Sequence, residues 1–204
     1  MIIQKVGSVR HAKHAEKIGV DAIIAAGYEE GGHPLSDDVT TMVLTPRIVE
    51  EVNIPVLTAG GIADGRGLAA ALVLGSSGVM MATRFLLSRE STLSPEIKAR
   101  FLDKGESDTS IVCKSTGLQA RALDTKLTEQ IKEIERQGGG INGLRDLITG
   151  RRLIPANQAG DIEGAMWSVG QTIGLIGELE SCAKIVSDMV KTAETALRGS
   201  LSCF

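Results

Sequence analysis

The sequence is poor in aromatic residues, which make up 2% of the chain, and its formal net charge is -3. A nucleic-acid surface needs a basic face and stacking side chains, so this composition argues against that class of partner. No apolar run is long enough to span a bilayer, and no membrane partner is expected. The cysteines show neither metal-ligand spacing nor a secretory pattern, which predicts a reducing compartment and a cytoplasmic location; they are Cys113, Cys182 and Cys203.

The first half of the chain instead alternates short apolar runs with helical patterns. Strands are expected at residues 2–6, 21–26, 54–57 and 78–81. Helical patterns follow at residues 9–18, 46–52, 64–74 and from about residue 94. Asp64 is expected to cap the third of these helices, and Gly75 to end it. This alternation predicts a parallel sheet with right-handed crossovers.

The predicted fold class is α/β, of the TIM-barrel (β/α)8 type, with only the last four βα units in this chain. A complete barrel has eight strands and typically about 250 residues. We therefore assign residues 1–102 to the C-terminal half of a barrel. Residues 103–204 show no clear βα repeat and are predicted to form a mainly helical region that packs on the barrel or caps it, with the strongest helical stretches at 118–136 and 175–197.

Glycine-rich loops follow the second and third predicted strands, at the sheet edge where such folds bind ligands. Gly60 and Gly61 stand between a strand and a helix N-terminus, so their N–H groups can approach a phosphate closely. Thr83, after the next strand, could offer a hydroxyl and an N–H to the same group. Glycines that only make tight turns are the alternative, but the matching loops and the strand order favour phosphate binding.

His33 follows two glycines at the end of the second predicted strand, where an imidazole can take or hold a proton near neutral pH. The alternative is a structural loop histidine. Lys5 ends the first strand at the same rim, where it could meet an anionic cofactor or simply be hydrated; we count it among the candidate cofactor contacts. Glu29 and Glu30 could set the local field or be solvated.

Two other features each allow a structural and a functional interpretation. Ser36-Asp37-Asp38 contains a pair of carboxylates, but this segment is expected to cap the turn that follows rather than to do acid/base work. Trp167, the only tryptophan, could line a pocket or fill a core.

The chain resembles the nitronate monooxygenase family, also called 2-nitropropane dioxygenase-like, a group of FMN-dependent (β/α)8-barrel enzymes. The resemblance covers nearly the whole chain and is carried by residues 5–22, 31–34, 59–72, 83–85 and 167–171. It implies that His33 lies beside the flavin as the catalytic base, with Gly32 against the flavin. It also implies contacts with the FMN phosphate from Ala59, Gly60, Gly61, Ala82 and Thr83.

The chain departs from the family pattern in three respects. Ala82 stands where the family usually has glycine, which a backbone N–H contact tolerates if the dihedral angles are ordinary. Glu30 stands where the family usually has a small residue or cysteine, which would change the charge of the pocket. The first half of the family fold, with the early loop that wraps the flavin, has no counterpart in this chain.

The resemblance implies flavin redox chemistry, in which the cofactor carries the electrons and the protein supplies binding, orientation and a proton acceptor. In that picture an alkyl nitronate is oxidised by O2 to a carbonyl compound and nitrite. Close relatives that share these motifs reduce enoyl thioesters or quinones with NAD(P)H, which is the alternative activity.

A half barrel leaves two open sheet edges with unpaired backbone groups. The expected partner is therefore a separate N-terminal half or a second copy of the chain. An inactive truncated product, or a subunit with only an assembly role, is the alternative from another functional class.

Overall fold

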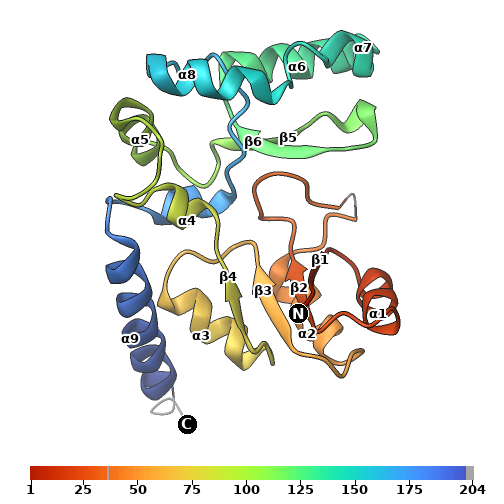
Figure 1. Ribbon diagram of the computed structural model, residues 1–204, viewed down its shortest axis with the longest axis vertical. Helices are drawn as coiled ribbons and strands as arrows, with labels where there is room; N and C mark the ends of the chain where they lie inside the picture. Colours follow the sequence, from red (N-terminus) through yellow and green to blue (C-terminus); the bar gives the residue numbers. More distant parts are fainter. Residues whose placement is uncertain (36, 201–204) are drawn as a thin grey trace.

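The computed structural model describes residues 1–35 and 37–200, and its lower part in Figure 1 is built around a parallel sheet. The sheet has four strands in the order β1-β2-β3-β4, which are Ile3–Val6, Ala22–Ala26, Val56–Ala59 and Gly78–Met80. Every neighbouring pair is parallel. The α/β class and the parallel sheet predicted from the apolar runs are thus confirmed, and the arrangement corresponds to part of a barrel.

Helices cover one face of this sheet. They are α1 (Val9–Lys17), α2 (Thr41–Val49) and α3 (Gly65–Val73). Ile23, Ala25 and Val56 point into this layer and form a buried cluster with Leu44 and Ile48 of α2. The continuous apolar strands are explained on this side by the helices that bury them.

The opposite face of the sheet carries apolar side chains that are covered less completely. Ile24 and Leu57 are paired neighbours on β2 and β3 and are only partly buried. Ile3, on the outer strand β1, keeps 47% of its surface exposed. The sheet therefore has one packed face and one open face.

The capping prediction for α3 is confirmed. The Asp64 Oδ1 atom accepts the backbone N–H of Arg66 at 2.9 Å, and Gly75 follows the helix with a φ of +91°. A side chain that accepts an otherwise unpaired N–H of the first turn stabilises a helix end by about 1 kcal/mol.

The prediction for α2 is wrong in its start. The helix begins at Thr41, not at Pro46, and the proline lies inside it. The carboxylate of Glu29 accepts the Thr41 N–H at 2.9 Å, so a residue of the preceding loop supplies the missing partner of the first turn. Of the segment expected to cap here, Ser36 lies outside the described residues, and the N-cap position belongs to Thr40, which makes no side-chain capping bond.

The second half of the chain contains a β-hairpin besides its helices. β5 (Thr109–Val112) pairs antiparallel with β6 (Ala120–Leu123), so the first part of the stretch 118–136 is a strand rather than a helix. Pairing with β5 overrides the helical preference of this segment. The α-helices around the sheet edge and the hairpin are α4 (Thr83–Leu86), α5 (Pro95–Leu102), α6 (Lys126–Arg136), α7 (Ile141–Leu144) and α8 (Leu153–Ala159).

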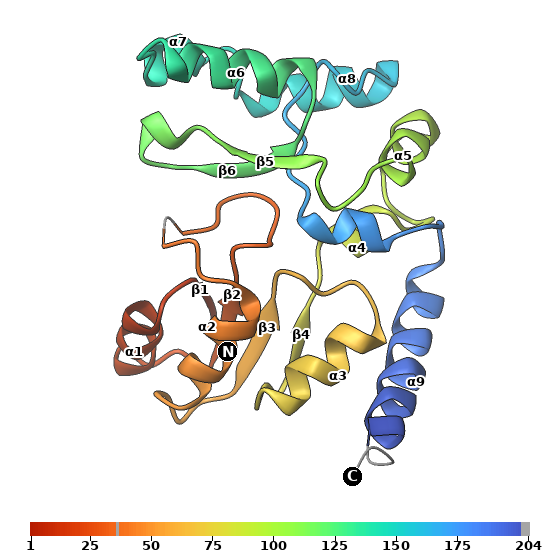
Figure 2. The ribbon, with the colours of Figure 1, turned by 180° about the vertical axis from the view of Figure 1, so that it is seen from behind.

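The last helix, α9 (Cys182–Ser200), returns to the sheet and packs along α3 (Figures 1 and 2). It begins later than the predicted stretch 175–197, whose first residue belongs to a 3-10 turn, Gln171–Leu175. A Cβ atom added to Gly65 would lie 2.4 Å from the Met189 carbonyl oxygen, so the two helices touch backbone to backbone. The segment after residue 102 is therefore not wholly separate from the sheet.

Two sequence expectations about composition can be placed in the structure. Cys113 and Cys182 are free thiols, and Cys203 lies outside the described residues. Trp167 is 4% exposed, meets Phe101 edge to face at 5.7 Å between ring centroids and donates its indole N–H to the Ile162 carbonyl. It belongs to the core and also lines a pocket beside Leu86 and Ile154. Over residues 1–35 and 37–200, no helix has both the length and the apolar character needed to cross a membrane.

Candidate functional site

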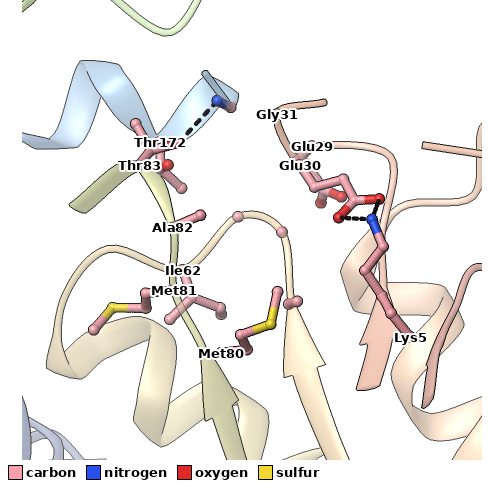
Figure 3. Close-up of a pocket in the computed structure, with 14 residues that line it drawn as sticks. Lys5, Glu29, Glu30, Gly31, Ile62, Met80, Met81, Ala82, Thr83 and Thr172 are labelled. Carbon is pink, nitrogen blue, oxygen red and sulfur yellow. Dashed lines mark hydrogen bonds and ion pairs between the residues drawn. The ribbon is translucent and has the colours of Figure 1, made fainter. Parts of the chain in front are cut away.

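A cleft lies at the carboxyl edge of the sheet, above the ends of β1 to β4 (Figure 3). Its volume is about 130 Å³. Complete small-molecule sites usually measure about 300–1,000 Å³, so this cleft has the size of a site for one end of a cofactor. The residues that line it are Lys5, Glu29, Glu30, Gly31, Ala59, Gly60, Gly61, Ile62, Met80, Met81, Ala82, Thr83, Gly170 and Thr172.

The turn after β3 is made by two consecutive glycines with left-handed dihedral angles. The φ angles are +84° at Gly60 and +73° at Gly61. A Cβ atom on Gly60 would lie 2.8 Å from the Gly27 carbonyl oxygen, which leaves no room for a side chain. Within the described residues, neither glycine N–H donates a hydrogen bond. Both donors are therefore available to an anion in the cleft.

The loop after β4 faces this turn across the cleft. The backbone N–H groups of Ala82 and Thr83 also lack acceptors in the described part of the chain. Ala82 has a φ of -117°, so the alanine in place of the usual glycine is not strained. The Thr83 hydroxyl accepts the Gly170 N–H at 2.9 Å and keeps its own proton to donate.

The loop after β2 supplies the third wall, and Glu29 fixes its position. The Glu29 carboxylate accepts both the N–H and the hydroxyl of Thr41, while the Thr41 hydroxyl also lies 2.9 Å from the Gly60 carbonyl oxygen. Glu29 and Thr41 together therefore connect three segments: the β2 loop, the start of α2 and the glycine turn. The sequence left two roles open for Glu29, setting the local field of the loop or being solvated. The structure gives it a third role, because its carboxylate accepts the first N–H of α2.

Lys5 and Glu30 form an ion pair across the cleft wall (Figure 3). The Lys5 Nζ atom lies 2.8 Å and 2.9 Å from the two carboxylate oxygens of Glu30. The Glu30 side chain is 9% exposed, against 41% for Lys5. Burial raises the pKa of Glu30 above its ordinary value, and Lys5 and then His33 act against that rise. The charge of Lys5 is thus matched by a carboxylate of the same cleft.

His33 lies further along the β2 loop, outside the cleft lining. Its ring is exposed, and its Nδ1 atom lies 2.9 Å from the backbone carbonyl oxygen of Gln119. A carbonyl oxygen only accepts, so Nδ1 carries the proton in this contact. Gly32 precedes it with a φ of +88°. No other hydrogen bond of the ring is found in the described residues, which leaves Nε2 free to accept a proton.

A segment remote in sequence completes the cleft and was not found from sequence. Gly170 and Thr172 line it, and the Gln171 N–H donates to the Glu29 carbonyl at 3.0 Å. A Cβ atom on Gly31 would lie 2.5 Å from the carbonyl carbon of Val169, so the two loops are in backbone contact. Residues 167–171 carry part of the family resemblance, but the sequence predicts no contact with the cofactor for this segment; Gly170 is the residue that could have signalled one.

The structure thus brings most of the predicted site residues together. Those that line a single cleft are Lys5, Ala59, Gly60, Gly61, Ala82 and Thr83. Gly32 and His33 sit on the adjoining loop, where they approach β6 rather than the cleft. The arrangement offers backbone donors for a phosphate in the cleft and, on the adjoining loop, an imidazole with one free nitrogen.

Comparison with known proteins gives a consistent assignment. A family model described as nitronate monooxygenase matches residues 1–192. The "Probable nitronate monooxygenase" of Staphylococcus saprophyticus is 35% identical over 91% of this chain and 54% of its own length. A Rhodococcus jostii protein, "(3aS,4S,5R,7aS)-5-hydroxy-7a-methyl-1-oxo-octahydro-1H-indene-4-carboxyl-CoA dehydrogenase", is 33% identical over 95% of this chain and 64% of its own length.

Among solved structures, FabK from Thermotoga maritima superposes with a TM-score of 0.92 and 37% sequence identity. The match covers 99% of this chain and 63% of FabK. The nitroalkane oxidase of Streptomyces ansochromogenes gives a TM-score of 0.76 at 28% identity, over 96% of this chain and 58% of that structure. This chain therefore spans between half and two thirds of the length of these relatives.

Proposed function

The chain belongs to the nitronate monooxygenase family, and from that premise we propose that it works as an FMN-dependent oxidoreductase whose substrate is an alkyl nitronate oxidised with O2. The observation that carries the proposal is the pair of unpaired glycine N–H groups at the carboxyl edge of β3, which face those of Ala82 and Thr83 across a small cleft. Four backbone donors around one cleft suit the phosphate of FMN.

The residues present fit this cofactor at its phosphate end. Gly60 would hold the phosphate through its N–H only as glycine, because any Cβ atom would strike the Gly27 carbonyl. Ala59, Gly61, Ala82 and Thr83 would complete the phosphate contacts, and Gly32 would lie against the ring system. Bound FMN would supply the electron transfer, for which no amino-acid side chain in the cleft is suited.

His33 would manage the proton steps. Its Nδ1 atom is engaged with the Gln119 carbonyl, so Nε2 is the atom that would take a proton from the substrate and return it. Lys5 would bind an anionic group of the cofactor or substrate in competition with Glu30, because its Nζ atom lies 2.8 Å from the Glu30 carboxylate.

A second activity is reduction of an enoyl thioester or a quinone with NAD(P)H. The likeness to a carboxyl-CoA dehydrogenase over 95% of this chain favours a thioester among these substrates. Both activities would use the same phosphate loops and the same histidine. They differ in the substrate and the electron donor or acceptor that would reach the flavin. Product analysis with a nitronate and with an enoyl thioester separates them.

We further propose that the working site includes a complementary set of βα units. β1 and β4 are the outer strands of the sheet, and no strand within residues 1–35 or 37–200 pairs with their outer edges. The open face described above adds partly exposed Ile24 and Leu57 to these edges. A separate N-terminal half or a second copy of the chain would cover both; a chain that stays monomeric and binds no flavin would instead indicate an inactive or purely structural product.

The first experiment is the visible absorption spectrum of the purified chain with added FMN, recorded alongside its mass in solution. Bound flavin in a defined assembly supports the proposal, and its absence with the complementary half also present contradicts it. His33→Asn then tests the base: turnover of an alkyl nitronate should fall about a hundredfold or more, as for loss of a general base. His11→Asn, at an exposed position on α1, is the matched control and should leave turnover unchanged.

A further inference from the structure

The loop that carries His33 is held from above by strand β6, which is far away in sequence. The Arg121 N–H donates to the Gly32 carbonyl at 2.6 Å, and the Gly32 N–H donates back to the Arg121 carbonyl at 3.0 Å. These two bonds form a single antiparallel bridge between the loop and the hairpin. Gly32, the residue just before His33, therefore pairs with the outer edge of β6 as a third strand would.

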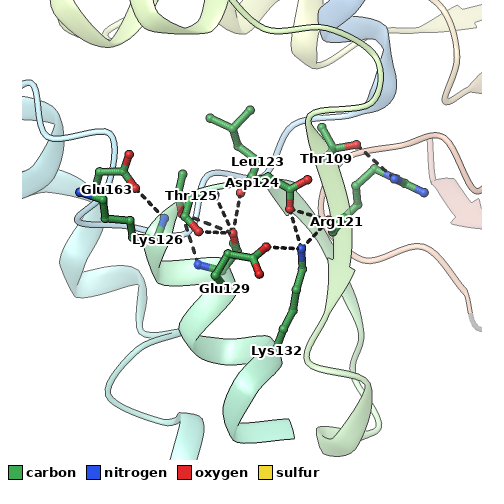
Figure 4. Close-up of polar contacts among 11 residues, drawn as sticks. Thr109, Arg121, Leu123, Asp124, Thr125, Lys126, Glu129, Lys132 and Glu163 are labelled. Carbon is green, nitrogen blue, oxygen red and sulfur yellow. Dashed lines mark hydrogen bonds and ion pairs between the residues drawn. The ribbon is translucent and has the colours of Figure 1, made fainter. Parts of the chain in front are cut away.

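The side chain of Arg121 holds the other end of the same loop. Its Nε–H donates to the Tyr28 carbonyl at 3.2 Å, and its guanidinium carbon lies 4.5 Å from the centre of the Tyr28 ring. Nη1 donates to the Thr109 hydroxyl at 3.1 Å on the neighbouring strand (Figure 4). The residue is only 2% exposed, and Nη2 has no partner in the described part of the chain.

A buried arginine with a spare donor is a costly feature. An unsatisfied buried polar group destabilises a fold, and no carboxylate pairs with this guanidinium among the described residues. A leucine or methionine would fill the space more cheaply. The bond to Tyr28 connects the β2 loop with the hairpin, and the bond to Thr109 holds the guanidinium in place within the hairpin.

Gln119 fixes the segment on either side of the histidine. Its backbone carbonyl accepts the His33 Nδ1–H at 2.9 Å, and its side-chain amide donates to the Leu35 carbonyl at 2.9 Å. This carbonyl directly precedes β6, which the backbone of Arg121 joins to Gly32 and the side chain of Arg121 joins to Tyr28. The imidazole is thus oriented by a group that lies 86 residues further along the chain.

We propose that Gln119, which directly precedes β6, and Arg121 of β6 are positioning residues for His33, which they hold in the tautomer protonated at Nδ1 with Nε2 directed to the reactants. The inference rests on the proposed role of His33 as a base. Neither residue touches the phosphate cleft, so their effect reaches the chemistry only through the imidazole. An imidazole that is held with its proton on Nδ1 can accept a proton at Nε2 at once, without first exchanging protons with water.

The test is a long-range ¹H–¹⁵N correlation spectrum of the ¹⁵N-histidine-labelled protein at about pH 8, above the ordinary pKa of histidine of about 6.5. The chain has three histidines, of which His11 and His14 are exposed on α1 and serve as internal references. His33 should show a protonated Nδ1 and an unprotonated Nε2. In Arg121→Met its Nε2 signal should shift toward the protonated range, while the reference signals stay in place.

Arg121→Met is chosen because replacing a buried charge with an apolar side chain of similar volume is often neutral for folding. If it fails to fold, Gln119→Ala at a partly buried position removes the side-chain bonds to Pro34 and Leu35 and should broaden or shift the same signal. Arg136→Met, an arginine on α6 with a 68% exposed side chain, is the matched control. Equal Nδ1-protonated signals in wild type and both variants would overturn the proposal, as would an Nε2-protonated His33 in the wild type.

Kinetics separate this inference from the proposed function. In the assembled, flavin-loaded protein, Arg121→Met should lower kcat about tenfold or more with little change in FMN affinity, since the phosphate loops are untouched. If the wild type shows no turnover but the tautomer shift occurs, the positioning role stands and the proposed reaction is wrong. If turnover is normal in a variant whose tautomer has changed, the positioning role is wrong and the proposed function stands.

Discussion

Replacing Gly60 with alanine should destabilise the protein far more than the same change at Gly19, although the two positions have similar dihedral angles. The φ values are +84° and +91°, so both alanines would pay the left-handed penalty of about 1–2 kcal/mol. At Gly19 nothing lies within 4 Å of the added Cβ atom. At Gly60 the Cβ atom would lie 2.8 Å from the Gly27 carbonyl oxygen, which is backbone and cannot rotate away.

Overpacking of this kind adds about 1–3 kcal/mol, so we expect Gly60→Ala to cost about 2–5 kcal/mol in free energy of unfolding. For a chain of this size each kcal/mol lowers Tm by roughly 2–4 °C. Urea unfolding and thermal scans of the two variants measure the difference directly. Equal losses at Gly60 and Gly19 would refute the close approach between the glycine turn and the β2 loop.

Gly61→Ala completes the series by separating binding from stability. Its φ is +73°, and the added Cβ atom would make only an ordinary 3.5 Å contact with a Glu29 carboxylate oxygen. Its stability should therefore resemble that of Gly19→Ala. Because alanine favours a relaxed turn that withdraws one phosphate donor, the Kd for FMN should rise roughly ten- to hundredfold, the worth of one hydrogen bond to a charged group. FMN fluorescence quenching measures it, and an unchanged Kd would remove this N–H from the phosphate site.

Three further outcomes follow from single contacts. Burial raises the pKa of Glu30 in the folded state, so the protonated carboxyl stabilises the fold fully below about pH 4.5 and this stabilisation is lost as the pH rises. Glutamine does not titrate, so the Tm of Glu30→Gln minus that of the wild type should become more positive from pH 4 to pH 8. Burial raises the pKa of the Cys113 thiol to about 11, so iodoacetamide at pH 8 should label the more exposed Cys182 first, and unfolding should equalise the two. Asp64→Ala removes the cap of α3 and should cost about 1 kcal/mol in urea unfolding, whereas Asp64→Asn should cost only a few tenths.

The parts of the fold that could be predicted from sequence are those specified by local pattern. β2 and β4 are apolar throughout, β3 is apolar except for Thr58, and Asp64 and Gly75 mark the two ends of α3 by their own chemistry. The hairpin was missed because Ala120 to Leu123 consists of alanine, arginine and leucine, which favour helices; its strand state comes from pairing with β5. The start of α2 was misplaced because its capping carboxylate, Glu29, lies 12 residues earlier.

The candidate site divides in the same way. The glycines after β3 and the residues after β4 follow directly from strand ends, and the structure brings them to one cleft. The pairing of Lys5 with Glu30 across 25 residues, and of Thr83 with Gly170 across 87, has no local signal. Such contacts are decided by how loops settle against one another once the sheet has formed, which a single sequence does not encode in its periodicity.

Residues 1–102, predicted from sequence to form a barrel-half domain, should not fold into the same structure by themselves. Without α9, the backbone of α3 at Gly65 loses the helix that touches it, and without β6, Gly32 and Tyr28 lose the partners that hold the His33 loop. We expect a chain ending at residue 102 to bind the dye ANS and to give a poorly dispersed ¹H–¹⁵N spectrum, as collapsed chains without fixed packing do.

The informative control adds α9 back to this truncated chain through a flexible linker. Covering α3 should restore dispersion for the sheet and its helices, because the buried cluster of β2, β3 and α2 lies wholly within the first half. The β2 loop should stay mobile, because β6 is still absent. A dispersed spectrum with an ordered His33 loop from the 102-residue chain alone would show that the sheet forms the site without the later segments. The backbone contacts at Gly31, Gly32 and Gly65 argue against this, because each joins the first half of the chain to a later segment.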